Sequence, residues 1–368
     1  MLARADVPLY LLERGLLEAA SIVSGDLVVE EISRRNRNYR VVRKRGPSYF
    51  VKQGFGIEGR STVGREANVY KYLQSIDEAR PLTRFLPRFI HYDPDPGVLV
   101  LELERDAENM AEYHARTGRV TSSVASSLGA AIGILHHATS HAQGSPQQFE
   151  TAPPWIFRIH HPGLAYIQQA SAANIALVQA IQRFPEFCDH LDGLHGNWRA
   201  RCLIHGDLKS ANHLVSKSRS QALARGLKVV DWELASMGDP AWDVGSVFGD
   251  YLALWLFSAP ITGETPPERF LELTRFPLDR VSPAVTSFWE SYRRHAFAEP
   301  AGEAEFMVRS VRYAAARLIQ TTYEVNQRSA RLDGNSVCIL QVSWNLLRRP
   351  EVALASLLGL TTGISVTS

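Results

Sequence analysis

The sequence LIHGDLKSANHLV, residues 203–215, places a polar centre between two short apolar arms. Apolar runs of this length, bounded by turn residues, are typical of short strands, so the polar centre is expected to be a loop fixed at both ends. Asp207 and Asn212 stand five residues apart in this loop, and Asp231 follows another apolar run at 227–230. A lone Asp or Asn in a turn commonly caps the backbone. Three polar groups placed in this way favour a chemical role instead.

Phosphoryl transfer is a reaction that needs such a set of groups. It requires a carboxylate that orients the acceptor hydroxyl, oxygen ligands for Mg²⁺, and a cation on the nucleotide phosphates. Asp207 is the candidate for the carboxylate. Asn212 and Asp231 offer an amide and a carboxylate oxygen, the ligand types that Mg²⁺ prefers. The loop and the strand after it therefore predict a phosphotransferase that uses Mg²⁺.

The composition is that of an ordinary globular chain. Of the 368 residues, 45% are hydrophobic and 21% are charged, and the formal net charge is +2. This charge gives no reason to expect a nucleic-acid or membrane partner. The longest apolar run, 251–261, is about half of the roughly 20 residues that a membrane span requires. Three cysteines without a CxxC pair favour a cytoplasmic location, and twelve histidines without an HExxH pattern give no sign of a metal besides Mg²⁺.

The hydrophobic patterns change from strand-like to helical near residue 105. We predict strands at 27–32, 39–44, 49–53, 88–92 and 98–104, and short strands at 202–204, 214–215 and 227–230. We predict helices near the N-terminus, from the caps Ser61 or Thr62 to 74, and at 108–114, 122–138 and 163–182, with mostly helix after 242. The predicted fold class is α+β, with a β-rich N-terminal lobe at 1–104 and a helical C-terminal lobe at 105–368.

The loop and its neighbour VVDWELASMGDPAWDVG, residues 229–245, together resemble a known family. They are similar to the catalytic and metal-binding segments of the aminoglycoside phosphotransferase and choline kinase-like family, which is related to protein kinases. The resemblance implies a bilobal kinase-like fold, with nucleotide bound between the lobes and the acceptor on the C-terminal lobe. It also implies ATP and Mg²⁺ as cofactors, although the sequence does not distinguish ATP from GTP.

The resemblance assigns a role to each residue of the loop region. Asp207 corresponds to the catalytic carboxylate, and Asn212 and Asp231 to the metal ligands. His205 corresponds to a histidine that braces the loop. Asp243 corresponds to a buried aspartate that supports the loop without taking part in the chemistry.

The resemblance also assigns residues in the N-terminal lobe. Lys52 stands where the family places the lysine that binds phosphate on the third strand, and Glu66 on the next helix is its expected partner. The backbone at the end of the strand at 98–104, at Glu102 and Leu103, is expected to contact the nucleotide base.

Two positions depart from the usual family pattern. The loop expected over the phosphates, residues 33–38, contains no glycine, whereas glycine normally lets the backbone approach phosphate there. Asn36 and Asn38 tolerate unusual backbone angles, and the arginines of this loop offer direct phosphate contacts. Lys209 stands where many family members that act on small molecules have histidine. It is predicted to neutralise the migrating phosphoryl group, and the alternative is a solvated loop lysine.

The acceptor is the least defined part of this prediction. The segment 153–182 corresponds to the place of the substrate-recognition helices, and it resembles family members from the biosynthesis of lanthipeptides and thioamitides. The favoured acceptor is therefore a Ser or Thr of a precursor peptide, with a separate lyase as a partner. One alternative is a small alcohol such as an aminoglycoside, macrolide, sugar or choline-like compound. Another is an inactive nucleotide-binding scaffold for a lyase. Trp155, His160 and His161 are candidate acceptor contacts or ordinary surface residues.

Overall fold

The structure, a computed structural model, describes residues 2–32, 36–140, 149–217, 226–260, 269, 272–297 and 302–360. The chain forms two compact units, Met1–Met110 with Asn212–Ala235, and Ala111–Ala211 with Ser236–Ser368. The sequence predicted one boundary, after residue 104. The segment Asn212–Ala235 belongs to the N-terminal unit because β8 (His213–Ser216) pairs with both β6 (Ala107–Asn109) and β9 (Lys228–Val229).

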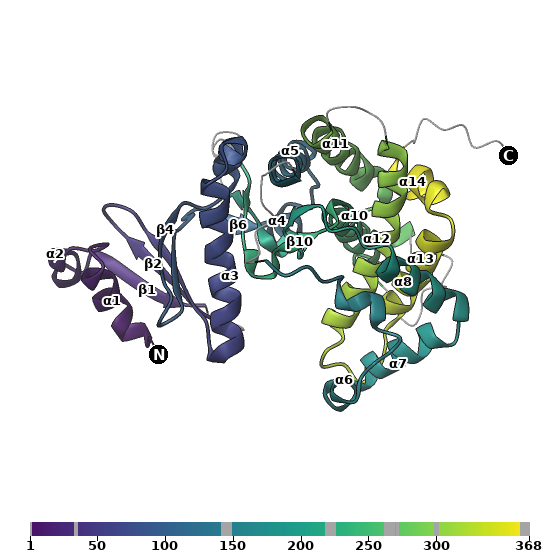
Figure 1. The fold of residues 1–368 in the computed structure, drawn as a ribbon, viewed down its shortest axis with the longest axis horizontal. Coiled ribbons are helices and arrows are strands. Elements are labelled where there is room, and N and C mark those ends of the chain that lie inside the picture. The colour runs from purple at the N-terminus through teal and green to yellow at the C-terminus, as the bar shows by residue number, and fades with distance from the viewer. Residues whose placement is uncertain are drawn as a thin grey trace. The chain divides into compact units, whose positions relative to one another are not determined.

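A five-stranded antiparallel sheet forms the centre of the N-terminal unit, in the order β1-β2-β3-β5-β4. Its strands are β1 (Leu27–Glu31), β2 (Arg37–Arg43), β3 (Tyr49–Gln53), β4 (Phe89–Asp93) and β5 (Val98–Glu102). α3 (Gly56–Gln74) lies along one side of this sheet (Figure 1). The prediction of five strands and one helix is confirmed.

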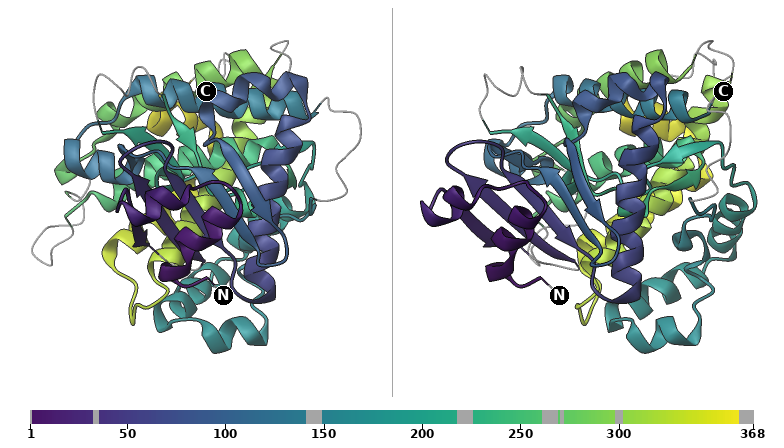
Figure 2. Two further views of the ribbon diagram at one scale, coloured as in Figure 1. Left: turned by 90° about the vertical axis from the view of Figure 1, so that its left-hand side faces the viewer. Right: turned by 60° about the vertical axis from the view of Figure 1, so that its left-hand side comes forward.

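The N-terminal helices cover the other side of the sheet. α1 (Val7–Glu13) and α2 (Ala19–Val23) follow η1 (Arg4–Asp6), and η2 (Asp77–Phe85) precedes β4. Val7 and Leu11 on α1 pack with Tyr39, Val41 and Val51 of the sheet in one buried cluster. Figure 2 shows the sheet between α1 and α3 from two further directions. The period-two alternation of buried side chains in β2 puts this cluster under α1.

The start of α3 differs from the prediction. The helix begins at Gly56, and the N-cap is Phe55 without a side-chain cap. Thr62 lies inside the helix, where its hydroxyl donates to the Gly59 carbonyl (3.0 Å). A Cβ at Gly54 would lie 2.2 Å from the Gly59 carbonyl oxygen. The close approach allowed by this glycine, and not a capping hydroxyl, places the first turn against the end of β3.

The C-terminal unit is mainly helical. Its helices are α4 (Met110–Thr117, starting at the unit boundary), α5 (Ser122–Ser140), α6 (Leu164–Gln169), α7 (Ala172–Gln182), α8 (Pro185–Gly196), α10 (Pro240–Phe257), α11 (Leu278–Ala296), α12 (Glu303–Val325), α13 (Gly334–Arg348) and α14 (Pro350–Leu358). α5 packs along α11, and α10 packs along α12 (Figures 1 and 2). Within the described ranges, no helix is both long and apolar enough to cross a membrane.

Glycines allow both helix pairs to approach closely. A Cβ at Gly129 on α5 would lie 2.2 Å from the Phe288 carbonyl oxygen on α11. A Cβ at Gly245 on α10 would lie 2.5 Å from the Ser310 carbonyl oxygen on α12. Both pairs therefore depend on a position without a side chain.

Two predicted helices of this half were wrong in their limits. Residue Glu108 lies in β6, where it pairs with Val215, and the helix starts only at Met110. The predicted helix at 163–182 is two helices, because the Ser171 side chain accepts the Asn174 N–H (3.0 Å) and caps α7. Serine competes with helical backbone bonding in this way, which ends α6 before it.

The strand that precedes Asp207 has a partner strand that the sequence did not predict. β7 (Cys202–Ile204) pairs antiparallel with β10 (Ser236–Gly238). Short 3₁₀ helices in the described part of the chain include η3 (Trp155–Arg158), η4 (Ser210–Asn212) and η5 (Trp232–Leu234). The predicted strands at 214–215 and 227–230 correspond to β8 and β9.

Candidate functional site

A buried lysine with three carboxylates occupies the N-terminal unit. The Lys52 ammonium on β3 lies 2.8 Å from Glu66 Oε2 on α3, which places the two predicted partners in contact. It also lies 2.5 Å from Asp231 Oδ1 and 2.9 Å from Glu233 Oε2. The structure thus brings together three residues that the sequence selected and adds Glu233.

Asp231 has an unusual backbone conformation. Among the described residues it is the one non-glycine residue with a positive φ, 67°. Such a conformation is costly for most side chains, tolerated best by Asp and Asn, and often found at functional sites. The Val230 N–H next to it donates to the Asn212 carbonyl (3.0 Å), since β8 and β9 pair there. Asn212 and Asp231, the two predicted metal ligands, therefore stand at adjoining points of the β8–β9 ladder.

The charges of the Lys52 cluster do not cancel. Burial alone would lower the pKa of Lys52, but Glu66, Asp231 and Glu233 outweigh it and hold that pKa above its ordinary value. The lysine is therefore cationic, and one positive charge faces three carboxylates. The side chain of Asp231 is 39% exposed. An excess of carboxylate charge next to an accessible oxygen ligand fits a divalent cation such as Mg²⁺.

Glu233 and Asn36 extend this cluster. The Asn36 amide donates to Glu233 Oε2 (2.9 Å), so the side chain of this predicted phosphate-loop residue is already directed at an acid. Asn38 lies within β2, in register with Lys52, and is part of the sheet. Residues 33–35 of the predicted loop lie outside the described residues. Glu233 was missed by the sequence analysis, although its position two residues after Asp231 was a usable signal.

The predicted nucleotide-base contacts lie at the end of β5. The Leu103 N–H donates to the Ser48 carbonyl (2.8 Å), and the Glu102 N–H donates to the Arg88 carbonyl (2.9 Å). Both N–H groups are thus engaged within the N-terminal unit. A base that contacts this segment must use carbonyl oxygens or the N–H of Glu104.

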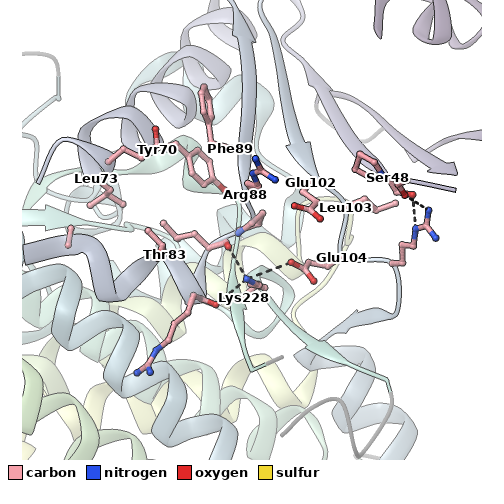
Figure 3. Close-up of a pocket in the computed structure, with 18 residues that line it drawn as sticks. Ser48, Tyr70, Leu73, Thr83, Arg88, Phe89, Glu102, Leu103, Glu104 and Lys228 are labelled. Carbon is pink, nitrogen blue, oxygen red and sulfur yellow. Dashed lines mark hydrogen bonds and ion pairs between the residues drawn. The ribbon is translucent and has the colours of Figure 1, made fainter. Parts of the chain in front are cut away.

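Figure 3 shows a pocket of about 690 Å³ beside the same segment. Tyr70 and Leu73 of α3 and Phe89 of β4 form part of its apolar lining (Figure 3). The Lys228 ammonium lies 3.7 Å from Glu104 Oε1 at its edge. This pocket is a mixed apolar and charged space within the N-terminal unit.

The predicted catalytic carboxylate lies in the C-terminal unit, between two cations. Asp207 Oδ1 lies 3.0 Å from an Arg317 guanidinium nitrogen on α12, and Oδ2 lies 2.8 Å from Lys209 Nζ. Glu324 Oε1 lies 3.5 Å from Arg317, and its Oε2 lies 3.6 Å from Lys209. Lys209 is therefore not a simple solvated lysine, because it pairs with the carboxylate that it follows in the sequence.

These cations keep Asp207 ionised. Burial would raise the pKa of Asp207, but the charges of Arg317 and Lys209 outweigh it and hold that pKa below its ordinary value. Burial would lower the pKa of Lys209, and Asp207 and Glu324 raise it above the ordinary value. At neutral pH Asp207 is therefore anionic and Lys209 cationic.

Asp243 fixes the backbone just before Asp207. Its two carboxylate oxygens accept the N–H groups of His205 (2.7 Å) and Gly206 (3.0 Å). The Asp207 N–H donates a hydrogen bond to Nδ1 of His205 (3.3 Å). His136 Nε2 lies 3.2 Å from Asp243. The predicted supporting residues His205 and Asp243 thus both contact the backbone of the loop.

Arg317 was missed because nothing near the loop in the sequence points to it. It is only 1% exposed and lies in the apolar stretch Ala314–Ile319 of α12. A fully buried arginine is rare unless it is paired. An arginine inside an apolar helical run was therefore a signal of a buried ion pair. This signal did not identify Asp207 as the partner.

Of the three candidate acceptor contacts, only Trp155 lies near this part of α12. The ring of Trp155 lies 5.1 Å from the ring of Tyr323, and the ring of Tyr166 lies 5.6 Å from it. Tyr323 directly precedes Glu324 of the Asp207 cluster. His160 and His161 contact Asp192 on α8 instead.

Comparison with known proteins identifies the family. The model of the phosphotransferase enzyme family APH matches residues 29–272, which include the Lys52 cluster, Asp207, Lys209 and Asp243 but not Arg317 or Glu324. A choline kinase from Cryptosporidium parvum Iowa II superposes with a TM-score of 0.59 at 14% identity, covering 96% of this chain and 99% of that one. The amicoumacin kinase hAmiN, in complex with AMP-PNP, Ca²⁺ and Ami, gives a TM-score of 0.53 at 14% identity, covering 94% of each chain. No curated protein matched the sequence.

These likenesses establish the fold and the class of enzyme. At 14% identity the two structures show that the fold is kinase-like and α+β. The family match extends over most of the chain, including the loop at 203–215 from which the resemblance started. The protein therefore belongs to the APH family of phosphotransferases, the ATP-dependent enzymes of the aminoglycoside phosphotransferase and choline kinase type.

Proposed function

We propose that this enzyme transfers the γ-phosphate of ATP to a hydroxyl group of a small molecule. The observation that carries the proposal is the buried Asp207 carboxylate, kept ionised by Arg317 and Lys209. In the reaction, the acceptor oxygen bonds to the γ-phosphorus while the bond from that phosphorus to the bridging oxygen of ADP breaks. The hydroxyl proton passes to Asp207 and then to solvent.

The lowered pKa of Asp207 defines its part in this reaction. A weakly basic carboxylate is a poor group for removing a hydroxyl proton early, but it is a good hydrogen-bond acceptor that orients the hydroxyl. Phosphoryl transfer passes through a loose transition state that makes little demand on an early base. Asp207 therefore orients the acceptor and takes its proton late, and Lys209 provides positive charge beside it.

The N-terminal unit is assigned to the nucleotide. Lys52 pairs with the nucleotide phosphates and is oriented by Glu66, while Asn212 and Asp231 hold Mg²⁺. The excess carboxylate charge around Lys52 supports this assignment. When bound, Mg²⁺ neutralises negative charge on the phosphate oxygens.

A small acceptor has more support than a peptide. Two of the structures with a similar fold are, by name, a choline kinase and an amicoumacin kinase. In this chain, the rings of Trp155 and Tyr166 lie 5.1 Å and 5.6 Å from the ring of Tyr323 on α12, and Tyr323 directly precedes Glu324. A group of aromatic rings favours a compact alcohol with an apolar or cationic body. The peptide acceptor and the inactive scaffold for a lyase have no comparable observation in their favour.

The test is phosphate transfer from labelled ATP, with Mg²⁺, to two acceptor pools. One pool contains small alcohols, including choline, aminoglycosides and macrolides, and the other contains Ser/Thr peptides. Asp207→Ala protein is the blank, and Asp189→Asn, an exposed acid on α8, is the matched control. We expect transfer to the small-alcohol pool only, with activity retained in Asp189→Asn. Transfer only to peptides would overturn the acceptor class, and equal transfer by Asp207→Ala would overturn the mechanism.

A further inference from the structure

Two histidines and an aspartate meet on the C-terminal unit, outside the clusters described above. His160 and His161 lie just after η3, separated from it by Ile159, and Asp192 comes from α8. His160 Nε2 lies 3.3 Å from Asp192 Oδ1, and His161 Nε2 lies 3.6 Å from Asp192 Oδ2. The three residues each offer one ligand atom, and these atoms all lie within 4.8 Å of one another.

These separations are close to those around a tetrahedral metal ion. Zn²⁺ binds imidazole nitrogen and carboxylate oxygen at about 2.0–2.2 Å, so the edges of its tetrahedron are ~3.3 Å long. The two measured nitrogen–oxygen distances fit such edges. Imidazole with carboxylate is a donor set for zinc and similar transition metals, whereas Mg²⁺ selects oxygen ligands.

The three residues are held in place and remain open on one side. His160 is 3% exposed, and its carbonyl accepts the Gln182 side-chain amide (2.8 Å). η3 packs against α8, which fixes the two parts of the chain relative to each other within this unit. The side chains of His161 and Asp192 are 52% and 46% exposed. An ion can thus enter from solvent and keep a water molecule as its fourth ligand, the usual arrangement of a three-ligand zinc site.

One neighbouring cation competes for the aspartate. Arg158 Nε lies 3.9 Å from Asp192 Oδ1, which is at the outer limit of an ion pair. Both side chains are about half exposed, and exposed pairs of this kind contribute little. Arg158 can therefore give up Asp192 to a metal ion at small cost.

We propose that His160, His161 and Asp192 form a Zn²⁺ site that ties the end of η3 to α8. This site is separate from the Mg²⁺ ligands and from the proposed transfer chemistry. The sequence analysis expected no metal besides Mg²⁺, because a histidine pair and a distant aspartate make no recognisable motif. Only the packing of η3 on α8 brings the third ligand to the pair.

Calorimetric titration of the full chain with Zn²⁺, after treatment with a chelator and dialysis, tests the site. Excess Mg²⁺ in the buffer competes with Zn²⁺ for the carboxylates around Lys52. We expect one Zn²⁺ per chain. His161→Ala and Asp192→Asn change exposed side chains, and each is expected to weaken this binding by at least about tenfold. Asp189→Asn, one turn earlier on α8, is the matched control and should bind as the wild type does.

A second measurement identifies the ligands. Co²⁺ substituted for Zn²⁺ gives visible absorption when it is bound in tetrahedral geometry. We expect this absorption in the wild type and in Asp189→Asn, and its loss in His161→Ala. Circular dichroism of each variant confirms that it is folded. Absence of stoichiometric Zn²⁺ binding, or equal binding by the wild type, His161→Ala and Asp192→Asn, would overturn the proposal.

Discussion

The two ionic clusters of this enzyme use the same kinds of side chain in opposite balance. Around Lys52, one cation faces the three carboxylates of Glu66, Asp231 and Glu233. Around Asp207, two cations face two carboxylates. Carboxylates thus outnumber the cation in the first cluster, and the two kinds of group are equal in number among the ion pairs of the second.

Because of this difference, the Lys52 cluster suits a further cation, whereas the Asp207 cluster already holds a cation for each of its carboxylates. Unbalanced charge in a partly buried place is costly, and a divalent ion relieves it. In the Asp207 cluster, Arg317 and Lys209 instead keep the Asp207 carboxylate ionised without any ligand. On the proposed function, the Lys52 cluster binds the charged nucleotide and the Asp207 cluster prepares the acceptor.

The largest expected effect is the loss of transfer in Asp207→Asn. The substitution keeps the size of the side chain but removes the charge that orients the hydroxyl, so kcat should fall by roughly 10³-fold. ATP affinity, measured by calorimetry, should change less than about threefold, because the nucleotide is assigned to the other cluster. A parallel loss of ATP affinity would contradict the separation of roles, and Asp189→Asn is the control.

Arg317→Met should give the largest loss of stability. It leaves the buried Asp207 charge with one cation in place of two, and breaking a buried pair costs about 3–5 kcal/mol of unfolding free energy. Urea denaturation measures this cost. Arg312→Met, an exposed position on the same helix, is the matched control and should be near neutral. Equal stability of the two variants would show that Arg317 does not hold Asp207. If the double variant Arg317→Met with Asp207→Asn regained unfolding free energy, this would show that the loss in Arg317→Met comes from its pairing with Asp207.

Asp231→Ala should weaken ATP binding in the presence of Mg²⁺. Removing an assigned metal ligand should raise the Kd of Mg·ATP by roughly 100-fold, and Glu233→Gln, which changes a supporting acid, by about tenfold. Calorimetry at several Mg²⁺ concentrations measures both. If ATP affinity in Asp231→Ala stayed as sensitive to Mg²⁺ as in the wild type, the metal would have to be held elsewhere.

The smallest expected effect is in the pH dependence of stability. The folded pKa of Asp207 lies below its unfolded value of about 3.9. Its contribution to stability is thus fully present above the unfolded pKa and is lost as the pH falls through the folded pKa. The stability difference between wild type and Asp207→Asn should be constant above about pH 5 and shrink below about pH 4. A difference that grows toward acid pH would show that the carboxylate is not stabilised in its ionised form.

The sequence predicted the parts of the molecule that depend on local patterns. Short apolar runs between turns predicted the five strands, and the family resemblance paired Lys52 with Glu66, which the structure places 2.8 Å apart. Fixed offsets also selected Asp207, Asn212 and Asp231. The roles of these residues in catalysis and metal binding remain predictions for the experiments above.

The features that the sequence missed depend on contacts between distant segments. Arg317 meets Asp207 across more than a hundred residues, and Asp192 meets His160 only because η3 packs on α8. The early start of α3 was missed for a different reason, because it depends on the close approach of Gly54 and Gly59 and not on a capping side chain. Residue patterns along the chain predict helices and strands from their periodicity. They do not predict which distant segments come into contact.

The pairing of β8 with both β6 and β9 has a consequence for how this protein can be divided. Each unit is encoded in two separate stretches of the gene, so no single truncation produces either unit whole. A fragment that ends at Met110 would carry Lys52 with Glu66 but without Asp231 and Glu233. Lys52 would then lack two of its three carboxylate partners. A split version of this enzyme should therefore be made by joining two chains that each contribute to both units.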